Sequence, residues 1–521
     1  MDLDALSPDA LAQNRQFTSE YLSLVANDPS DEKHRRLAWA RMGDGTAFYH
    51  GKPNAFSYVP RIFGDQTRDY FAQLSQTAYR IMCKVLDAYH RDPAVRALFR
   101  FDPRVERLVE LPLRYQATLP VTRVDFMIDA ASGDVHFCEF NTDASSGMDE
   151  TRNALNAVCQ TAPYQEFCAR YQCDTDMDSL FDGWVQTVRK LAFGAATGAG
   201  APAAASTTAS ASGLAAAIPD AAAATLDAAA AIPDQVAQSS DARPHLGIVV
   251  CLEDPNPQFG ELQTYAELFE AAGISCSIYD VRQLDFDGTR LFGKCAYYGR
   301  DNVAIDAVWR YCIVVDLLKY WDEVQPFINA IERGAVCMIG AFDTQIVHDK
   351  QLFALLRHPL LQALFTPDER HFIDRHIPET HFLDDEVLDL KTVADNPRDW
   401  VLKPTDWYAS INVVAGAECS RKEWQAHLET ALRNSDTSYL VQRFYAPSQT
   451  TTIPIYGNAG DFFAAPQLVG NLFGAYVYDG SFAGLYVRQG PHDVIGTARD
   501  GLVAPVLWVK ERSIRKSGGR M

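Results

Sequence analysis

The chain has 521 residues, too many for a single compact core, so we expect two or three domains. Its composition, 47% hydrophobic and 22% charged residues, is that of a folded globular protein and excludes fibrous and wholly disordered classes. The formal net charge of -20 predicts a surface that repels phosphates and anionic lipids. We therefore expect no nucleic acid and no membrane among its partners.

The cysteines and the N-terminus indicate the compartment. Eleven cysteines lie in apolar, strand-like runs without the paired spacings of a disulfide framework, which is typical of a reducing environment. Cys168 and Cys173 have the spacing of half a metal site, but no second pair follows, and buried small hydrophobes are the better interpretation. With no apolar signal segment and no run of about 18 apolar residues, we expect a cytoplasmic protein. Its oligomeric state stays open.

The first half of the chain changes its hydrophobic period several times. Spacings of three and four predict helices over Leu11–Leu98, interrupted by an aromatic loop at Phe48–Phe63. Alternation over Val121–Asn141 predicts a β-hairpin. Residues 195–242 are almost wholly Ala, Ser, Thr, Pro, Asp and Gly, a composition that predicts a disordered or loosely helical insertion.

Strand and helix patterns alternate in the segment that follows. His245–Cys251 and Ile274–Tyr279 are typical of buried strands, and Gly260–Ala272 between them of a helix, which together predict a βαβ unit in a small doubly wound sheet. No Gly-x-Gly-x-x-Gly follows its first strand, so a dinucleotide site has little support. The last segment, Val401–Val509, is rich in strands and predicts a mixed α+β nucleotide fold.

The hairpin at Val121–Asn141 is the most informative segment. The pairs predicted across it are Asp129 with Val135, Asp125 with Glu139, and Arg123 with Asn141. The last two pairs would share one face, because side chains alternate along each strand. The other face, with Val124, Phe126, Cys138 and Phe140, is apolar and is expected to be core.

Opposed carboxylates destabilise a sheet unless a positive group lies between them. Asp125, Glu139 and Asn141 offer two carboxylates and an amide oxygen, the kind of hard ligands that Mg²⁺ accepts, and Arg123 suits a phosphate or a carboxylate. A solvated sheet face with one salt bridge is the alternative. Spacing alone leaves the two interpretations open.

Arg-x-Asp followed by Glu-x-Asn-x-Asp-x-x-Ser resembles the corresponding strands of the glutathionylspermidine synthetase family and its circularly permuted ATP-grasp relatives. In that family the Asp, Glu and Asn are magnesium ligands and the Arg lies at the reacting phosphoryl group. The resemblance therefore implies Mg²⁺ at Asp125, Glu139 and Asn141, with Arg123 as a catalytic residue.

Later motifs follow in the family's order. Lys350, preceded by Asp349 where the family has Asn, and Lys403 in Val-Leu-Lys-Pro resemble the lysines that reach the ATP phosphates. Gln442 ends a run that resembles the hinge strand at adenine, and Arg488 ends one that resembles the late strand with a phosphate- or substrate-facing arginine. One departure stands out: the family's glycine-containing phosphate loop is replaced by Thr405–Val413, whose bulky residues and acid hinder a close approach of backbone to an anion.

The resemblance implies an α+β ATP-grasp fold in circularly permuted order, with an inserted doubly wound α/β lobe of the pre-ATP-grasp type and a helical N-terminal region. The expected domains are the helical region at 1–110, a first ATP-grasp segment with the magnesium hairpin at 111–193, the Ala-rich insertion at 194–243, the α/β lobe at 244–345, and the nucleotide-binding ATP-grasp segment at 346–521. The implied activity is an ATP- and magnesium-dependent ligation of a carboxylate to an amine through an acyl phosphate, as in glutathionylspermidine synthetase.

Other functions remain as alternatives. A catalytically degenerate nucleotide-binding module of the same fold would explain the altered loop, and a scaffold would use the Ala-rich insertion. Gly480–Gly484 does not match a Gly-x-Ser-x-Gly elbow, so a serine hydrolase has little support. The acid and the amine, small molecules or peptides, are not identified. Glu261, Arg310 and Asp343 of the α/β lobe are candidate contacts of the acceptor, but a surface or structural role is the favoured interpretation of each.

Overall fold

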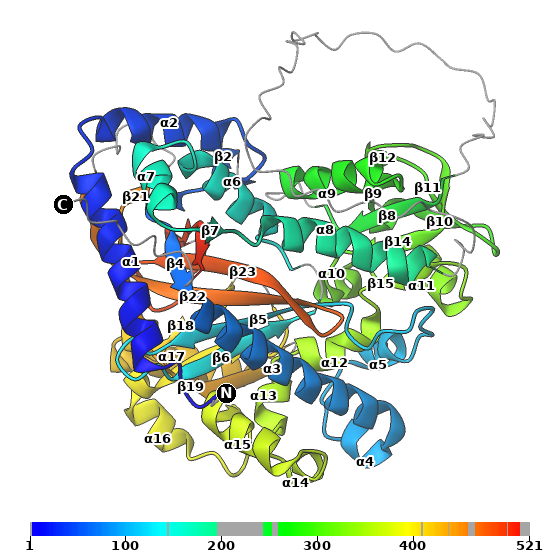
Figure 1. The fold of residues 1–521 in the computed structure, drawn as a ribbon. Helices are drawn as coiled ribbons and strands as arrows, with labels where there is room; N and C mark the ends of the chain where they lie inside the picture. Colours follow the sequence, from blue (N-terminus) through cyan, green and yellow to red (C-terminus); the bar gives the residue numbers. More distant parts are fainter. Residues whose placement is uncertain are drawn as a thin grey trace.

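An eight-stranded sheet runs through the centre of the molecule and is flanked by a five-stranded and a four-stranded sheet (Figure 1). The computed structural model describes residues 3–49, 51–142, 145–194, 243–252, 259–407, 410–435, 437–456, 464–496 and 499–510. The Ala-rich insertion expected at 195–242 lies outside the described residues. The fold is mixed α+β, as predicted.

Helices form most of the N-terminal region. They are α1 (Pro8–Ala26), α2 (Asp31–Gly43), α3 (Asp65–Arg91), α4 (Pro93–Arg96) and α5 (Pro103–Val109). The apolar positions expected on one face of α3, Tyr70, Leu74, Ala78 and Ile81, are all buried. This face packs on the eight-stranded central sheet. The helical prediction is therefore confirmed over most of this region.

The segment Phe48–Phe63, predicted to be a loop, contains short strands. They are β1 (Phe48–Tyr49), β2 (Lys52–Pro53), β3 (Phe56–Ser57) and β4 (Arg61–Gly64). β3 pairs with strands β21 and β24 near the other end of the chain and so joins the central sheet. The loop prediction was wrong because two-residue strands carry no period, and their hydrogen-bond partners are distant in sequence.

The central sheet has the strand order β21-β3-β24-β23-β22-β5-β6, and β20 also pairs with β22. Its other strands are β5 (Val121–Ile128), β6 (Val135–Asn141), β20 (Gln449–Thr452), β21 (Pro454–Ile455), β22 (Gln467–Tyr478), β23 (Ser481–Gly490) and β24 (Leu502–Val503). β22 lies between β5 and β23, so the late strands of the chain complete the sheet that the early hairpin begins.

The hairpin β5–β6 has the predicted functional register but not the predicted turn. Val135 pairs with Ile128, not with Asp129, and a bulge between Asp125 and Phe126 leaves one extra residue in β6. The two differences cancel, so that Asp125 lies opposite Glu139, and Arg123 opposite Asn141, as predicted. A bulge re-aims side chains, and here it takes Cys138 off the apolar face.

The α/β lobe confirms the predicted βαβ unit. Its five-stranded sheet has the order β12-β9-β8-β14-β15, with parallel pairing among the last four strands. The elements are β8 (His245–Val250), α9 (Phe259–Ala271), β9 (Ser275–Asp280), β12 (Ala296–Tyr298), β14 (Ala307–Arg310), α10 (Val314–Lys319), α11 (Gln325–Glu332) and β15 (Cys337–Ile339). Every residue of β8 is buried, as is usual for a central strand of a parallel sheet. A three-stranded sheet, β10 (Leu284–Phe286), β11 (Leu291–Gly293) and β13 (Val303–Ile305), lies beside it.

The four-stranded sheet is antiparallel and has the order β16-β19-β17-β18. Its strands are β16 (Thr380–Phe382), β17 (Trp400–Pro404), β18 (Val414–Ala415) and β19 (Tyr439–Arg443). Helices α16 (Leu390–Asp395) and α17 (Arg421–Leu432) accompany it, and α17 begins with a capping box of Ser420 and Glu423. A separate apolar cluster that includes Trp400, Trp424 and Val441 holds this unit together.

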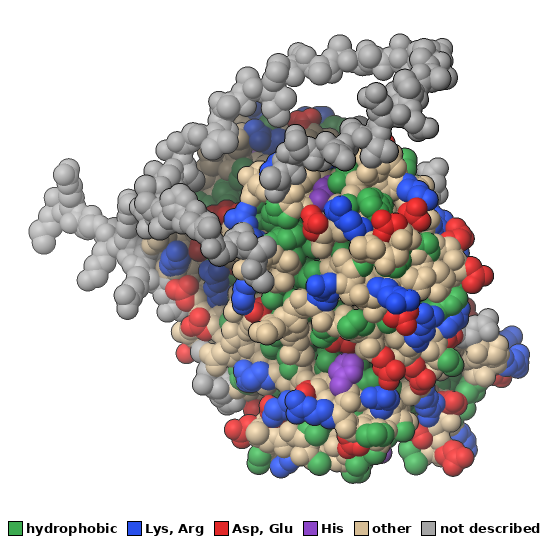
Figure 2. Space-filling model, turned by 90° about the vertical axis from the view of Figure 1, so that its right-hand side faces the viewer, with side chains coloured by type: hydrophobic (Ala, Val, Ile, Leu, Met, Phe, Trp, Pro, Cys, Tyr) green, Lys and Arg blue, Asp and Glu red, His purple; other side chains and the backbone are tan. Residues whose placement is uncertain are grey.

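The remaining elements connect these sheets. They are α6 (Met148–Val158), α7 (Ala162–Arg170), β7 (Cys173–Asp174), α8 (Met177–Val188), α12 (Gln345–His348), α13 (Gln351–Leu355), α14 (Pro359–Gln362), α15 (Pro367–His376) and β25 (Val506–Val509). β25 lies between β4 and β7 in a second three-stranded sheet. No helix in the described ranges has the length and apolarity needed to cross a membrane. On the face shown in Figure 2, acidic and basic side chains are interspersed.

Candidate active site

Glu139, on β6, links the two halves of the candidate site. One of its oxygens lies 3.3 Å from Lys350 Nζ, and the other accepts a hydrogen bond of 3.4 Å from Asn141 Nδ2. Burial alone would raise its pKa, but Lys350 and Lys403 outweigh burial and lower the pKa of Glu139 to about 2. Glu139 is therefore ionised at neutral pH.

Arg123 and Asp125, on β5, form a two-point ion pair. Arg123 donates from Nε and Nη2 to the two oxygens of Asp125, each at 2.8 Å, and from Nη1 to the Ser146 carbonyl at 2.5 Å. Asn141 Nδ2 donates to Asp125 Oδ2 at 3.1 Å. Burial raises the pKa of Asp125, with Arg123 opposing the shift. The predicted quartet of Arg123, Asp125, Glu139 and Asn141 is thus brought together on one face.

Gly474, on β22, makes room for this ion pair. It lies directly opposite Asp125 in the sheet. A Cβ atom at Gly474 would lie 2.9 Å from Arg123 Cδ and 2.9 Å from Asp125 Oδ1, closer than van der Waals contact permits. The sheet can hold a partly buried arginine and a buried carboxylate side by side because its neighbouring strand has no side chain at this point.

Two lysines from separate elements meet at Glu139. Lys350 lies between α12 and α13 and donates from Nζ to the Trp407 carbonyl at 2.9 Å. Lys403, on β17, donates to the Cys138 carbonyl at 3.2 Å and to Gln442 Oε1 at 2.7 Å. Burial lowers the pKa of Lys403, whereas Glu139 and two further carboxylates raise that of Lys350 against the effect of burial.

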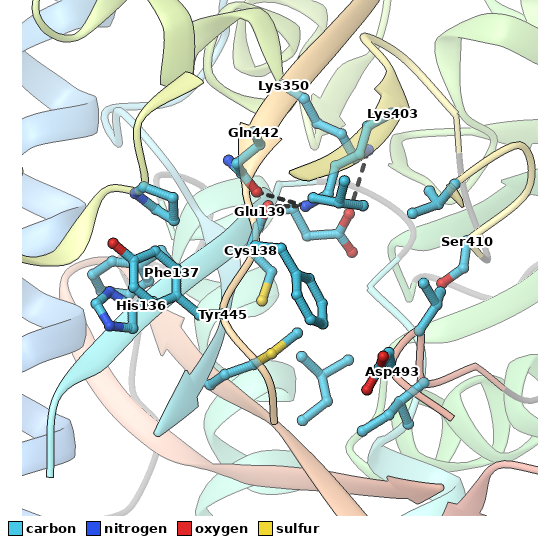
Figure 3. Close-up of a pocket in the computed structure, with 18 of the residues that line it drawn as sticks. His136, Phe137, Cys138, Glu139, Lys350, Lys403, Ser410, Gln442, Tyr445 and Asp493 are labelled. Atoms are coloured by element: carbon cyan, nitrogen blue, oxygen red, sulfur yellow. Dashed lines mark hydrogen bonds and ion pairs between the residues drawn. The ribbon is translucent and has the colours of Figure 1, made fainter. Parts of the chain in front are cut away.

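These side chains line an open cavity between the hairpin and the four-stranded sheet. Figure 3 shows Glu139, Lys350, Lys403 and Gln442 gathered at one end of it. The lining also includes Met127, His136, Phe137, Cys138, Pro378, Val401, Trp407, Ser410, Val413, Arg443, Phe444, Tyr445, Leu472, Asp493, Val494 and Ile495. The cavity therefore combines a cationic end with largely apolar and aromatic walls, which is typical of small-molecule sites.

An aromatic pair lies at another part of the cavity wall. The rings of His136, on β6, and Tyr445, just after β19, are stacked with centroids 3.5 Å apart at 17°. Burial lowers the pKa of His136 to about 4, so the imidazole is neutral at pH 7. The stack joins the hairpin to the four-stranded sheet across the cavity (Figure 3).

Arg488, on β23, does not line the cavity but lies beside the quartet. Its guanidinium and that of Arg123 are 5.2 Å and 5.4 Å from the centroid of the Tyr486 ring. Arg488 Nη2 donates to Glu150 Oε2 at 3.0 Å, and Tyr486 donates to the same oxygen at 3.1 Å. Both predicted catalytic arginines are therefore partly buried and paired with a carboxylate.

The altered loop that starts at Thr405 turns its acid away from the cavity. Asp406 Oδ2 accepts a hydrogen bond of 2.9 Å from Gln345 Nε2 on α12, and Asp406 is absent from the cavity lining. Trp407 and Ser410 do line it. Residues 408 and 409 lie outside the described ranges. The bulk of Trp407 stays at the cavity wall.

The three candidate acceptor contacts of the α/β lobe are buried. Arg310 donates to the carbonyls of Gly340, Cys312 and Ala341, which is a structural role. Glu261 accepts from the backbone N–H of Gly147 at 3.0 Å and from the Tyr265 hydroxyl at 2.7 Å. Asp343 is 2% exposed, and burial raises its pKa to about 7. These hydrogen bonds favour the structural interpretation of Arg310 and Glu261, whereas the two carboxylate oxygens of Asp343 have no hydrogen-bond partner among the described residues.

The donor set of the quartet fits a magnesium ion. Asn141 Nδ2 bridges Asp125 and Glu139 at 3.1 and 3.4 Å, so oxygens of both carboxylates converge on one point. A half-turn of the Asn141 amide would place its oxygen there, giving the oxygen ligands that Mg²⁺ prefers. Within the residues that the structure describes, no group of three His, Cys, Asp or Glu side chains that could hold a metal ion is found.

Several residues of the site were not predicted. Thr380 accepts a hydrogen bond from Gln442, Glu150 accepts one from Arg488, and Gly474 leaves space beside the ion pair. No local sequence motif marks these three residues, because each contact joins elements that are distant in sequence. His136 and Tyr445 were placed on predicted strands, but their stacking depends on how the hairpin docks on the four-stranded sheet. Stacking between such distant elements leaves no pattern in a single amino-acid sequence.

No protein-family model matches the chain, and no curated protein matches its sequence. Among solved structures, a glutathione synthetase-like effector from Globodera pallida in its apo form aligns over 92% of this chain and 98% of that chain, with a TM-score of 0.55 and 11% identity. A candidate gamma-glutamylcysteine synthetase from Methylobacillus flagellatus KT aligns over 80% of this chain and 83% of that chain, with a TM-score of 0.37 and 10% identity. The first likeness shows that the chain has the fold of a glutathione synthetase-like protein.

Proposed function

We propose that this protein is an ATP- and magnesium-dependent ligase of the ATP-grasp type that joins a carboxylate to an amine. The observation that carries the proposal is the meeting of Glu139, Lys350 and Lys403 at one end of a cavity between two sheets. The shared fold with a glutathione synthetase-like effector supports it. Such a set suits a nucleoside triphosphate with its metal ion, because the two cations neutralise phosphate oxygens and the ionised carboxylate binds the metal.

In this proposal the cavity holds ATP. Lys350 and Lys403 bind phosphate oxygens, and the apolar walls with the end of β19 at Gln442 hold the base. Asp125, Glu139 and Asn141 would hold Mg²⁺. When bound, the ion would neutralise part of the negative charge of the phosphates.

The proposed reaction has two steps. An oxygen of the substrate carboxylate bonds to the γ-phosphorus, the bond from phosphorus to the β-phosphate bridging oxygen breaks, and ADP leaves. The amine nitrogen then bonds to the acyl carbon, phosphate leaves with the bonding electrons, and the nitrogen loses a proton. Arg123 and Arg488 stabilise the negative charge that develops on the acyl oxygens, an electrostatic role that is often large in such catalysis.

The substrates are proposed as a small-molecule or peptide acid and a small-molecule or peptide amine; glutathione and spermidine are one possible pair. The circularly permuted order and the domain limits given above are part of the same proposal. We further propose that the enzyme is cytoplasmic and has no nucleic acid or membrane partner.

A second candidate is a nucleotide-binding module without turnover. The position of Trp407 at the cavity wall, in a loop that replaces glycine-containing sequence, favours it. Such a module would bind ATP and release no ADP with any acid and amine.

The proposal is tested by measuring ADP release from ATP and Mg²⁺ with panels of carboxylic acids and amines. We expect at least one pair to stimulate release, and Glu139→Gln to reduce that release by about 100-fold or more, because the carboxylate between the two lysines is lost. Glu429→Gln, an exposed change on α17, serves as the matched control. Near-normal release by Glu139→Gln would remove the magnesium assignment, and binding without release by the wild type would favour the module.

A further inference from the structure

A chain of hydrogen bonds behind the cavity wall ends at Lys403. The Thr380 hydroxyl donates to the Pro378 carbonyl at 2.8 Å. Gln442 Nε2 donates to the Thr380 oxygen at 3.0 Å, and Lys403 donates to Gln442 Oε1 at 2.7 Å. Thr380 and Gln442 are buried, with 7% and 4% of their surface exposed, so water does not compete for these bonds.

The direction of each bond follows from the first one. A carbonyl oxygen only accepts, so the Thr380 proton is committed to Pro378 and the Thr380 oxygen must act as an acceptor. That oxygen selects the NH₂ end of the Gln442 amide. The Gln442 carbonyl oxygen is thereby turned toward the Lys403 ammonium, which has no acceptor atom of its own.

The register of the four-stranded sheet places these groups in line. Thr380, on β16, lies directly opposite Gln442 on β19, and Gln442 lies opposite Val401 on β17. Lys403 is two residues beyond Val401 and therefore on the same face. A long side chain reaches such a diagonal neighbour, so the relay is fixed by strand pairing.

We propose that Thr380 is a positioning residue that, through Gln442, aims the Lys403 ammonium at the phosphates of the nucleotide. Lys403 donates to Gln442 and to the Cys138 carbonyl, its hydrogen-bond acceptors within the part of the chain that the structure describes. An ammonium has three protons, so one remains for a ligand in the cavity that Lys403 lines. Thr380 does not line that cavity and acts only through the relay.

This inference rests on the proposed function, and its test separates the two. Thr380→Val keeps the shape of the side chain but removes the hydroxyl, so the Gln442 amide loses the acceptor that orients it and can turn its NH₂ toward the ammonium. We expect Thr380→Val to weaken MgATP binding about tenfold or more by titration calorimetry, since hydrogen bonds to charged groups are strong. Thr380→Ser, which keeps the hydroxyl, should bind MgATP like the wild type.

Adenosine binding is the second measurement, because adenosine lacks phosphates. A purely structural role of Thr380 would change the affinity for adenosine and for MgATP alike. We expect Thr380→Val to weaken adenosine binding much less than MgATP binding, because adenosine lacks the phosphates at which the Lys403 ammonium is aimed. Equal MgATP binding by the wild type and Thr380→Val would overturn the inference, as would equal losses of ATP and adenosine affinity in that variant. If the wild type bound no MgATP, the proposed function itself would fail, and the inference with it.

Discussion

Partly buried Arg123 and buried Asp125 form an ion pair with two hydrogen bonds, and the neighbouring strand leaves space for it at Gly474. Removing one partner of such a pair is costly, because the remaining charge is then buried without a counter-charge. Glu139 differs, since its two lysines hold it ionised at the cavity. Arg123 and Asp125 are thus held by their own ion pair, whereas Glu139 lies at the cavity.

The sequence contained enough information to bring this quartet together but not to place every atom. The alternation over Val121–Asn141 predicted that Asp125 lies opposite Glu139, and it does. The predicted turn was shifted by one residue, and the bulge beside Asp125 that compensates for it has no sequence signature here. The shift and the bulge also explain why Cys138 lines the cavity instead of the core.

We predict that Gly474→Ala destabilises the protein by about 1–3 kcal/mol, because the added methyl group must displace Arg123 or Asp125. Urea unfolding measures the change. Gly490→Ala, at the end of β23, is the control, because its added Cβ would lie no closer than 3.3 Å to any neighbouring atom, the nearest being Ile495 Cγ2. Equal unfolding midpoints for the two variants would show that the sheet does not need the space at Gly474.

At the scale of elements, α9 of the α/β lobe is tied to the loop before α6. Glu261 on α9 accepts from the Gly147 N–H, and Ser146, next to Gly147, accepts from Arg123. The Glu261 carboxyl group is therefore buried at the N-terminus of α6, where it accepts a hydrogen bond from a backbone N–H group that has no partner within the helix. The βαβ pattern predicted α9 and its flanking strands to within one or two residues, but not this contact, because it depends on the docking of the lobe.

Glu261 predicts a pH dependence of stability. Burial, with Glu150 and Asp149 nearby, raises its pKa to about 8 from the ordinary value of 4.5. The folded state therefore holds a proton that the unfolded state loses, and the stabilisation is full below about pH 4.5 and declines as the pH rises to about 8. Glu261→Gln carries no such proton, so its stability relative to wild type should rise over this window by up to about 1.4 kcal/mol per pH unit.

Chemical denaturation of the wild type and Glu261→Gln at pH 5, 6, 7 and 8 measures this difference. Taking the difference removes the contributions of other buried acids, such as Asp176, whose pKa is about 6. A stability difference that stays constant over this range would contradict a protonated Glu261.

At the scale of the whole molecule, the cavity is assembled from β6, the turn before α13, β17 and β19, which are far apart in sequence. The order of motifs predicted that these segments meet, and the structure brings Glu139, Lys350, Lys403 and Gln442 into one cavity. Sequence could not reveal that Arg123 and Arg488 would be paired with carboxylates away from the cavity lining, because both partners depend on packing between distant strands.

The most direct test of the proposed nucleotide site is a thermal-shift titration with the non-hydrolysable ATP analogue AMP-PNP, with and without Mg²⁺, on the wild type and Asp125→Asn. We predict a rise in melting temperature of the wild type that grows with ligand concentration and depends on Mg²⁺, since a ligand that binds the folded state stabilises it. The rise should be lost or strongly reduced in Asp125→Asn. The absence of any shift in the wild type at millimolar nucleotide would contradict the nucleotide site on which the proposed function depends.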